Sequence, residues 1–229
     1  DFIFFTGSTA IGKVVGESAG SRLIPHVLEL GGKCPCVVDA SADLRVSARR
    51  ILNGKFFNAG QTCFAPDFVV VEKKVKEELV KEMVEQLENH QWGEEMAKMV
   101  HCKQFDRIHS LIDESAQQFG ANADASKIAP TLLIDVDWQH PSMVEEVFGP
   151  VLPVLSYDGD SDLIERLRGL GSPLALYLFS KDQPWCEGML KSIRSGSVCI
   201  NDTMKQSSNL ELPFGGVGES GYGRYRGRY

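Results

Sequence analysis

The chain has 229 residues, of which 43% are hydrophobic and 24% charged, a composition typical of globular proteins with one or two domains. Its formal net charge of -7 and the lack of a basic tract argue against nucleic-acid binding. No apolar run approaches the roughly 20 residues that a membrane-spanning helix needs, so no transmembrane segment is expected.

Predicted strands and helices alternate along the chain. In chain order they are strand 2–5, helix 8–20, an apolar segment at 24–30, strand 35–39, helix 42–57, strand 68–71, helices 73–91 and 103–118, strand 131–135, helix 160–169, strand 174–179, helix 182–194 and strand 197–201. This alternation predicts an α/β fold with a mostly parallel sheet flanked by helices. Residues 213–229, rich in Gly, Arg and Tyr, are expected to form an irregular loop or tail.

Three local signals refine these boundaries. Ser41 is expected to cap helix 42–57, and Asn58-Ala-Gly60 to end it. The strand at 2–5 is apolar throughout, which is typical of a buried parallel strand with a neighbour on each side. We therefore expect further sequence before Asp1.

Cysteine usage indicates the redox environment. Six cysteines are present. At this chain length, and with no secretory signal visible, we expect free thiols and an intracellular, cytoplasmic protein. No set of Cys and His residues has the spacing of a zinc site, so no metal is expected.

The segment Gly7-Ser-Thr-Ala-Ile-Gly-Lys-Val14 resembles a phosphate-binding loop. It fits the pattern G-x-x-x-x-G-K, but Val14 stands where a Ser or Thr would hold Mg²⁺, which argues against an NTPase. A strand, a glycine turn and a helix N-terminus still make an anion site, to which Ser8 or Thr9 could add a hydroxyl donor. The alternative is that Gly7 and Ser8 only form a turn and a helix cap.

Four other residues are considered as candidates for chemistry. Cys63 lies between a helix end and Pro66, where a thiol can be exposed and activated, although a buried structural cysteine is the alternative. Glu29 ends an apolar strand, where desolvation would raise its pKa toward that of a general base unless the carboxylate reaches solvent. Glu145 and Glu146 read locally as solvated loop acids.

Together these segments resemble the aldehyde dehydrogenase superfamily, in particular its class 3 and fatty aldehyde dehydrogenase branch. The matching stretches are Phe5-Thr-Gly-Ser8 with Gly12, Glu29-Leu-Gly-Gly-Lys33, Gly60-Gln-Thr-Cys63, Glu145-Glu-Val-Phe-Gly-Pro150 and Leu212-Pro-Phe-Gly-Gly-Val-Gly218. Their order and spacing match over essentially the whole chain. The resemblance therefore favours the functional interpretation of Cys63 and Glu29.

The resemblance implies oxidation of an aldehyde to a carboxylic acid with NAD or NADP. Cys63 matches the nucleophile, which forms a thiohemiacetal and then a thioester. Glu29 matches the base that activates water for hydrolysis of the thioester, which favours a free acid over transfer to coenzyme A. Glu146 matches the residue that holds the nicotinamide ribose, and Phe148 the one that packs near the nicotinamide. The positions at the pyrophosphate turn and along the nicotinamide site correspond to Gly7, Ser8, Leu30 and Gly31.

The family's chain is about twice as long, and the match begins inside its cofactor domain. We therefore expect residues 1–32 to be the C-terminal remnant of a Rossmann-like NAD(P)-binding domain. Residues 33–212 are expected to be the catalytic domain, and residues 213–229 a C-terminal loop or tail. In the family a strand or tail segment completes the neighbouring subunit, so a homodimer is expected.

Two hypotheses about the activity remain open. The first is an NAD(P)-dependent dehydrogenase acting on apolar aldehydes. The second is a catalytically incomplete fragment that keeps a reactive thiol but binds no dinucleotide. One departure bears on the site: Arg226 stands where relatives in the class 3 branch often carry His.

Overall fold

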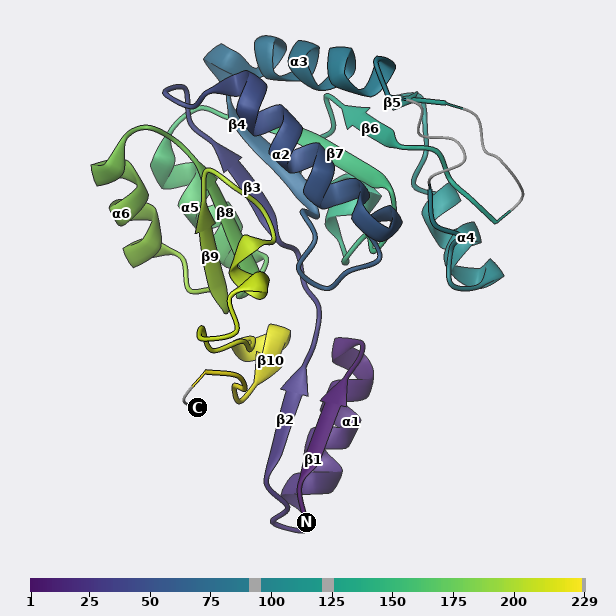
Figure 1. Ribbon diagram of the computed structural model, residues 1–229, viewed down its shortest axis with the longest axis vertical. Coiled ribbons are helices and arrows are strands. Elements are labelled where there is room, and N and C mark those ends of the chain that lie inside the picture. Colours follow the sequence, from purple (N-terminus) through teal and green to yellow (C-terminus); the bar gives the residue numbers. More distant parts are fainter. Residues whose placement is uncertain (91–95, 121–125, 228–229) are drawn as a thin grey trace.

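The computed structural model describes residues 1–90, 96–120 and 126–227, which form two β-sheets and the helices around them (Figure 1). Within these residues the larger sheet has seven strands in the order β5-β6-β7-β4-β3-β8-β9, and the smaller has three in the order β1-β2-β10. The two sheets are consecutive along the chain until its end, when β10 returns to the smaller one.

The larger sheet is parallel except at one edge. Its strands are β3 (Pro35–Val38), β4 (Phe68–Glu72), β5 (Ala116–Gln118), β6 (Thr131–Ile134), β7 (Val151–Tyr157), β8 (Ala175–Phe179) and β9 (Ser197–Ile200). Only β5 pairs antiparallel, with β6. The expected α/β fold with a mostly parallel sheet is confirmed.

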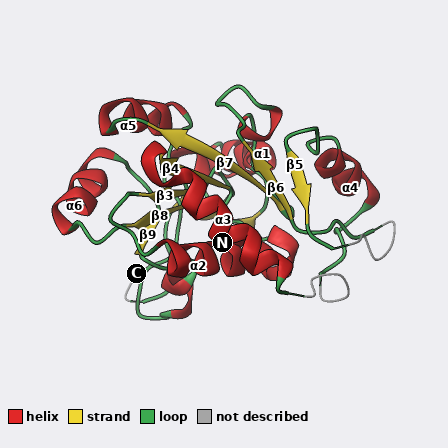
Figure 2. Ribbon diagram, turned by 90° about the horizontal axis from the view of Figure 1, so that it is seen from above, coloured by secondary structure: helices red, strands yellow, loops and turns green. Residues whose placement is uncertain are grey.

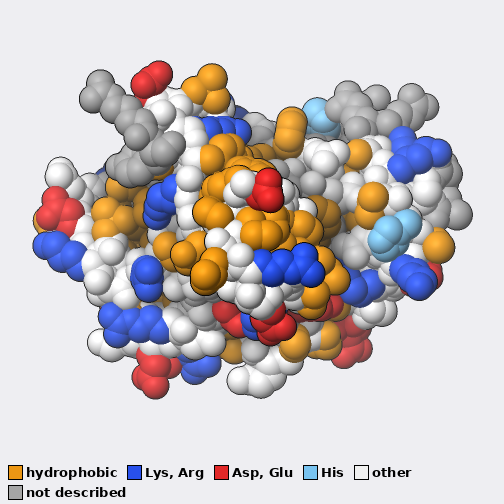
Figure 3. Space-filling view, turned by 90° about the horizontal axis from the view of Figure 1, so that it is seen from below, with side chains coloured by type: hydrophobic (Ala, Val, Ile, Leu, Met, Phe, Trp, Pro, Cys, Tyr) orange, Lys and Arg blue, Asp and Glu red, His pale blue; other side chains and the backbone are white. Residues whose placement is uncertain are grey.

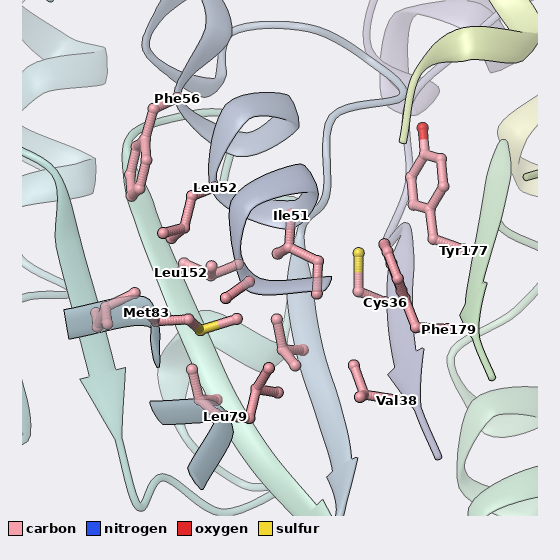
Figure 4. Close-up of a cluster of buried hydrophobic side chains, with 14 of the residues drawn as sticks. Cys36, Val38, Ile51, Leu52, Phe56, Leu79, Met83, Leu152, Tyr177 and Phe179 are labelled. Atoms are coloured by element: carbon pink, nitrogen blue, oxygen red, sulfur yellow. The ribbon is translucent and has the colours of Figure 1, made fainter. Parts of the chain in front are cut away.

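Helices cover both faces of this sheet, which is why its central strands are apolar at nearly every position. Helices α2 (Leu44–Phe56) and α3 (Lys76–Glu88) lie on one face, and α5 (Asp160–Gly169) and α6 (Gln183–Ser192) on the other (Figure 2). Figure 4 shows Ile51 of α2 and Met83 of α3 pointing toward the strands, where Cys36 and Val38 are fully buried.

The smaller sheet consists of β1 (Ile3–Thr6), β2 (His26–Glu29) and β10 (Gly221–Tyr222), with α1 (Thr9–Gly20) connecting β1 to β2. Strand β1 is parallel to β2, and β10 is antiparallel to it. Figure 3 views the end of the molecule where this sheet lies and shows hydrophobic side chains gathered there. Among the described residues β1 lies at the edge of this sheet with β2 as its neighbour, and Phe4 is 51% exposed.

Other differences from the sequence prediction have identifiable structural causes. The helix expected at 103–118 is instead α4 (Cys102–His109) followed by β5. Between them the Asp113 carboxylate accepts a hydrogen bond from the Ser115 N–H at 2.9 Å, a turn that competes with the helix. The strand β7 was not predicted. The expected irregular tail contains β10, because its glycines allow close approach to β2.

Two helix boundaries also differ. The cap of α2 is Asp43, whose carboxylate accepts from the Val46 N–H, while the Ser41 hydroxyl bonds to Asp39. The helix expected at 73–91 begins with a 3₁₀ turn at Lys73–Val75 and continues as α3; its predicted last residue lies outside the described residues. These shifts of a few residues leave the order of elements unchanged.

Candidate functional site

A cavity of about 740 Å³ lies where the end of β2, the start of α1, the loop after α2 and the loop before β7 meet. Its lining comprises Thr6, Gly7, Ser8, Thr9, Ala10, Glu29, Gly31, Gln61, Thr62, Cys63, Gln104, Arg107, Glu145, Glu146 and Phe148. The cavity is therefore lined by all the site residues predicted from the sequence except Leu30. Leu30 is buried beneath α1, where a Cβ at Gly12 would lie 2.4 Å from its Cδ2.

The glycine turn places the N-terminus of α1 at this cavity. The Gly7 N–H donates to the Glu29 carbonyl at 3.1 Å, which ties the turn to β2. The Ser8 hydroxyl caps α1 by accepting from the Ile11 N–H at 3.5 Å. Turn and cap are thus both present, and they leave the positive end of the helix dipole facing the cavity.

The loop that carries Cys63 is shaped by an unusual turn. Helix α2 ends at Phe56, and Asn58, Ala59 and Gly60 all adopt left-handed conformations, with φ of 50°, 53° and 71°. Three such residues in succession reverse the chain, and the expected stop at these positions is confirmed. The half-buried Cys63 then reaches the cavity.

Gly60→Ala tests this turn. The left-handed φ and a Cβ placed 2.3 Å from the Gly149 carbonyl oxygen should together lower the free energy of unfolding by about 1–3 kcal/mol. Urea denaturation measures the change. Gly171→Ala is the matched control, because its φ of 86° is similarly strained but its Cβ would meet only a side-chain atom at 3.7 Å. Equal losses in the two variants would mean that the contact with Gly149 is unimportant.

The chemical state of Cys63 depends on its surroundings. Burial, and next the nearby carboxylates of Glu146 and Glu29, raise the pKa of the Cys63 thiol to about 11. The thiol therefore predominates at neutral pH in the chain by itself. A proton acceptor or a positive charge brought to the cavity would favour the thiolate.

Glu29 lies at the end of β2, opposite Gly221 of β10. Its side chain is buried, and neither carboxylate oxygen has a hydrogen-bond partner among the described residues. Burial raises the pKa of Glu29 to about 7, although the charges of Arg224 and Arg226 oppose the rise. A carboxyl with this pKa can both accept and release a proton near neutral pH.

Glu146 differs from its neighbour Glu145. Glu145 is exposed and pairs with Arg107 at 2.8 Å, as expected for a solvated loop acid. The Glu146 carboxylate instead lies on Gly31, where an added Cβ would be 2.0 Å from Oε2, and the backbone N–H of Gly32 favours its ionised form. Burial, and next the charge of Asp67, raise the pKa of Glu146 to about 8.

Several lining residues were not identified from the sequence. Gln61 anchors the Cys63 loop by donating to the Lys98 carbonyl at 3.0 Å. Gln104 of α4 donates to the Phe148 carbonyl at 3.0 Å, and Arg107 lies one helical turn later. Their spacing of three residues places both on one face of α4, but the sequence offered no sign that this face meets the cavity.

Among residues 1–90, 96–120 and 126–227, no helix is long and apolar enough to cross a membrane. The same residues contain no group of three or more His, Cys, Asp and Glu side chains suited to a metal ion.

Comparison with known proteins gives the family. Residues 1–229 match the sequence profile described as the aldehyde dehydrogenase family. The chain belongs to the aldehyde dehydrogenase family. The family confirms the resemblance noted from the sequence, and the similar proteins below include members of its family 3 branch.

A Dictyostelium discoideum protein named aldehyde dehydrogenase family 3 comG is 40% identical over 236 residues, covering 100% of this chain and 50% of that protein. The rat protein named aldehyde dehydrogenase, dimeric NADP-preferring, is 40% identical and 52% covered. The substrate-bound structure of Staphylococcus aureus AldH superimposes with a TM-score of 0.94 at 39% identity, covering 100% of this chain and 52% of that one. The chain thus spans about half the length of the relatives it matches.

Proposed function

We propose that this chain carries the catalytic residues of an NAD- or NADP-dependent aldehyde dehydrogenase that forms a carboxylic acid. The observation that carries the proposal is that Cys63, Glu29 and Glu146, from three separate parts of the sequence, line one cavity. Cys63 can act as a nucleophile, and Glu29, with a pKa near 7, can act as a base. Glu146 lies against Gly31, where a cofactor could approach the backbone. Family membership supports the same reaction class.

Cys63 is proposed as the nucleophile. Its thiolate attacks the aldehyde carbon, forming a C–S bond and a thiohemiacetal, and the Cys63 N–H is a candidate donor to the oxyanion. A bound dinucleotide would supply the acceptor for the hydride that leaves this carbon. The carbon then remains attached to Cys63 as a thioester.

Glu29 is proposed as the base that completes the reaction. It takes a proton from a water molecule, whose oxygen attacks the thioester carbon. The C–S bond breaks, Cys63 leaves as a thiolate, and the substrate departs as a carboxylic acid. The unpartnered, buried carboxylate of Glu29 is suited to this role because no side chain among the described residues competes for the water.

The nicotinamide half of a dinucleotide fits the residues present. Glu146 would hold the ribose hydroxyls, Phe148 would pack near the nicotinamide, and Leu30 and Gly31 would supply backbone beside it. Gly7 and Ser8, at the N-terminus of α1, would face the pyrophosphate. The rat relative's name describes an NADP-preferring, dimeric protein, which supports a dinucleotide cofactor and a homodimer here.

The domain division of the sequence analysis is retained as part of this proposal. Residues 1–32 belong to a cofactor-binding domain, residues 33–212 form the catalytic domain, and residues 213–229 form the C-terminal segment. The separate small sheet supports the first boundary, since β1 and β2 pair with no strand of the larger sheet. Pairing of β10 with β2 means that the C-terminal segment returns to the cofactor side.

The proposal is tested by incubating the protein with NAD⁺ or NADP⁺ and a series of apolar aldehydes while following the absorbance of reduced nicotinamide. Aldehyde-dependent reduction with formation of the acid is the expected result. The competing hypothesis, a fragment that binds no dinucleotide, predicts alkylation of Cys63 but no thermal shift on addition of either dinucleotide.

Gly31→Ala should weaken dinucleotide binding without unfolding the chain. The new Cβ would lie 2.0 Å from Glu146 Oε2, so the carboxylate must leave the position proposed for ribose binding. Loss of a hydrogen bond to a charged group should raise the Kd for the dinucleotide about tenfold or more, as measured by calorimetric titration. Gly20→Ala is the control, because a Cβ there meets nothing within 4 Å. Unchanged affinity in Gly31→Ala would contradict the role of Glu146.

A further inference from the structure

A buried ion pair lies behind the cavity, outside the machinery described above. The ammonium of Lys33 bonds to Oδ2 of Asp67, and their side chains are only 7% and 3% exposed. Lys33 follows the two glycines after β2, and Asp67 immediately precedes β4. A buried ion pair contributes little net stability, because desolvation of both charges offsets their attraction. The role of this pair is therefore inferred from the other hydrogen bonds that Lys33 and Asp67 make.

Those contacts converge on one segment of backbone, residues 142–147. Lys33 Nζ also donates to the Ser142 carbonyl at 2.6 Å and to the Glu145 carbonyl at 3.2 Å. Asp67 Oδ1 accepts from the Val147 N–H at 2.8 Å. The pair thus holds the backbone on both sides of Glu146.

We propose that Lys33 and Asp67 are a positioning pair that fixes residues 142–147 and thereby holds the Glu146 carboxylate against Gly31 and the Gly32 N–H. The importance of that position for the reaction rests on the proposed function of Glu146. The clamp itself rests on the hydrogen bonds alone. Arg107 of α4 donates to the Val147 carbonyl from the outer side, so the segment is held from both sides.

The charges around Glu146 decide which variants are informative. Lys33 and Lys55 favour its ionised form, and Asp67 opposes it. Removing only Lys33 would leave a buried, unpaired carboxylate, which is strongly destabilising. Lys33→Met combined with Asp67→Leu removes both charges of the pair and all its bonds to the segment. Asp67→Asn is the conservative variant, because it keeps an oxygen that can accept from the Val147 N–H.

Hydrogen exchange of single amides tests the clamp without requiring activity. In the double variant, the amides of Val147 and Gly32 should exchange about tenfold or more faster than in the wild type, while those of α6 keep their rates. Asp67→Asn should retain more protection at Val147 than Asp67→Leu. The exposed pair Lys81–Glu85 is the control: its removal by Lys81→Met and Glu85→Leu should leave the Val147 and Gly32 amides unchanged.

Two results would overturn the proposal. One is unchanged exchange at Val147 or Gly32 in a folded double variant. The other is an equal acceleration of all amides, including those of α6, which would mean that the pair only stabilises the fold. If the double variant does not fold, equal protection at Val147 in Asp67→Asn and Asp67→Leu overturns the clamp.

Dinucleotide binding is measured separately on the same variants. If Glu146 holds the ribose, the double variant should bind the dinucleotide more weakly than the wild type. The loss of affinity in the Asp67→Asn variant should be smaller. A wild-type protein that binds neither NAD⁺ nor NADP⁺ would refute the proposed function, whereas the exchange rates would still decide whether the clamp exists.

Discussion

Cys63→Ala is expected to lower aldehyde oxidation by about 10⁴-fold or more, because no other thiol lines the cavity of the described chain and the reaction has no alternative nucleophile. Steady-state turnover with a saturating aldehyde measures the loss. Cys102→Ala is the control, since Cys102 is an exposed thiol at the start of α4, outside the cavity lining, and its removal should leave turnover unchanged.

The high pKa of Cys63 gives the wild-type protein a pH-dependent signature that Cys63→Ala should lack. Because the thiolate is the reactive species and the pKa is about 11, the rate of Cys63 alkylation by iodoacetamide should rise about tenfold per pH unit from pH 7 to pH 10. Peptide mapping by mass spectrometry follows Cys63 alone. A rate that levels off below pH 8 would contradict the burial and carboxylate proximity that the structure shows.

Turnover that persists in Cys63→Ala would overturn the proposed mechanism rather than the fold. Retained dinucleotide binding with no turnover would support it, because binding uses Glu146 and the glycine turn. Loss of binding as well as turnover would indicate that the substitution disturbed the loop, and the exchange rate of the Ala65 amide, which donates to the Thr62 carbonyl at 2.9 Å, would report that change.

Glu29→Gln is expected to separate the two halves of the reaction. The amide cannot take a proton from water, so thioester hydrolysis should slow by about 10²–10⁴-fold, while the first hydride transfer persists. Rapid mixing should therefore show a burst of reduced nicotinamide followed by almost no turnover. Intact-mass spectrometry should detect the acyl group on Cys63. Absence of the acyl adduct, together with unchanged steady-state turnover, would refute Glu29 as the base.

The same variant has an expected pH dependence. In the wild type, hydrolysis should increase as pH rises through about 7, because the base acts in its ionised form. Glu29→Gln should lose this limb of the profile. If Glu29 only filled space, the pH profile of Glu29→Gln would be the same as that of the wild type.

Stability provides an independent check on Glu29. Its folded-state pKa of about 7 lies above the ordinary value of 4.5, so between these values the folded chain holds a proton that the unfolded chain releases. Stability should therefore fall as pH rises from about 4.5 to about 7. In Glu29→Gln this decrease should be smaller, and urea denaturation at several pH values measures it. Identical slopes in both proteins would mean that the carboxyl is not buried in solution.

The sequence predicted the order and type of most elements because each carries its own local signal. Central strands such as β4 are continuous apolar runs, and helices such as α3 repeat their apolar residues at helical spacing. The prediction failed where a local turn replaces part of a helix and where one segment depends on another. Helix α4 ends early because of the Asp113 turn, and β10 exists only because β2 offers it a partner.

For the site, the sequence alone determined which residue types stand in which motifs, and the joint order of those motifs indicated the family. Local chemistry favoured a solvated acid at Glu146, because paired charges in loops usually face water. Only the tertiary structure placed its carboxylate on Gly31 and left the Glu29 oxygens without partners. Burial, and the pKa shifts that burial causes, arise from contacts between residues far apart in the chain, and no local pattern encodes those contacts.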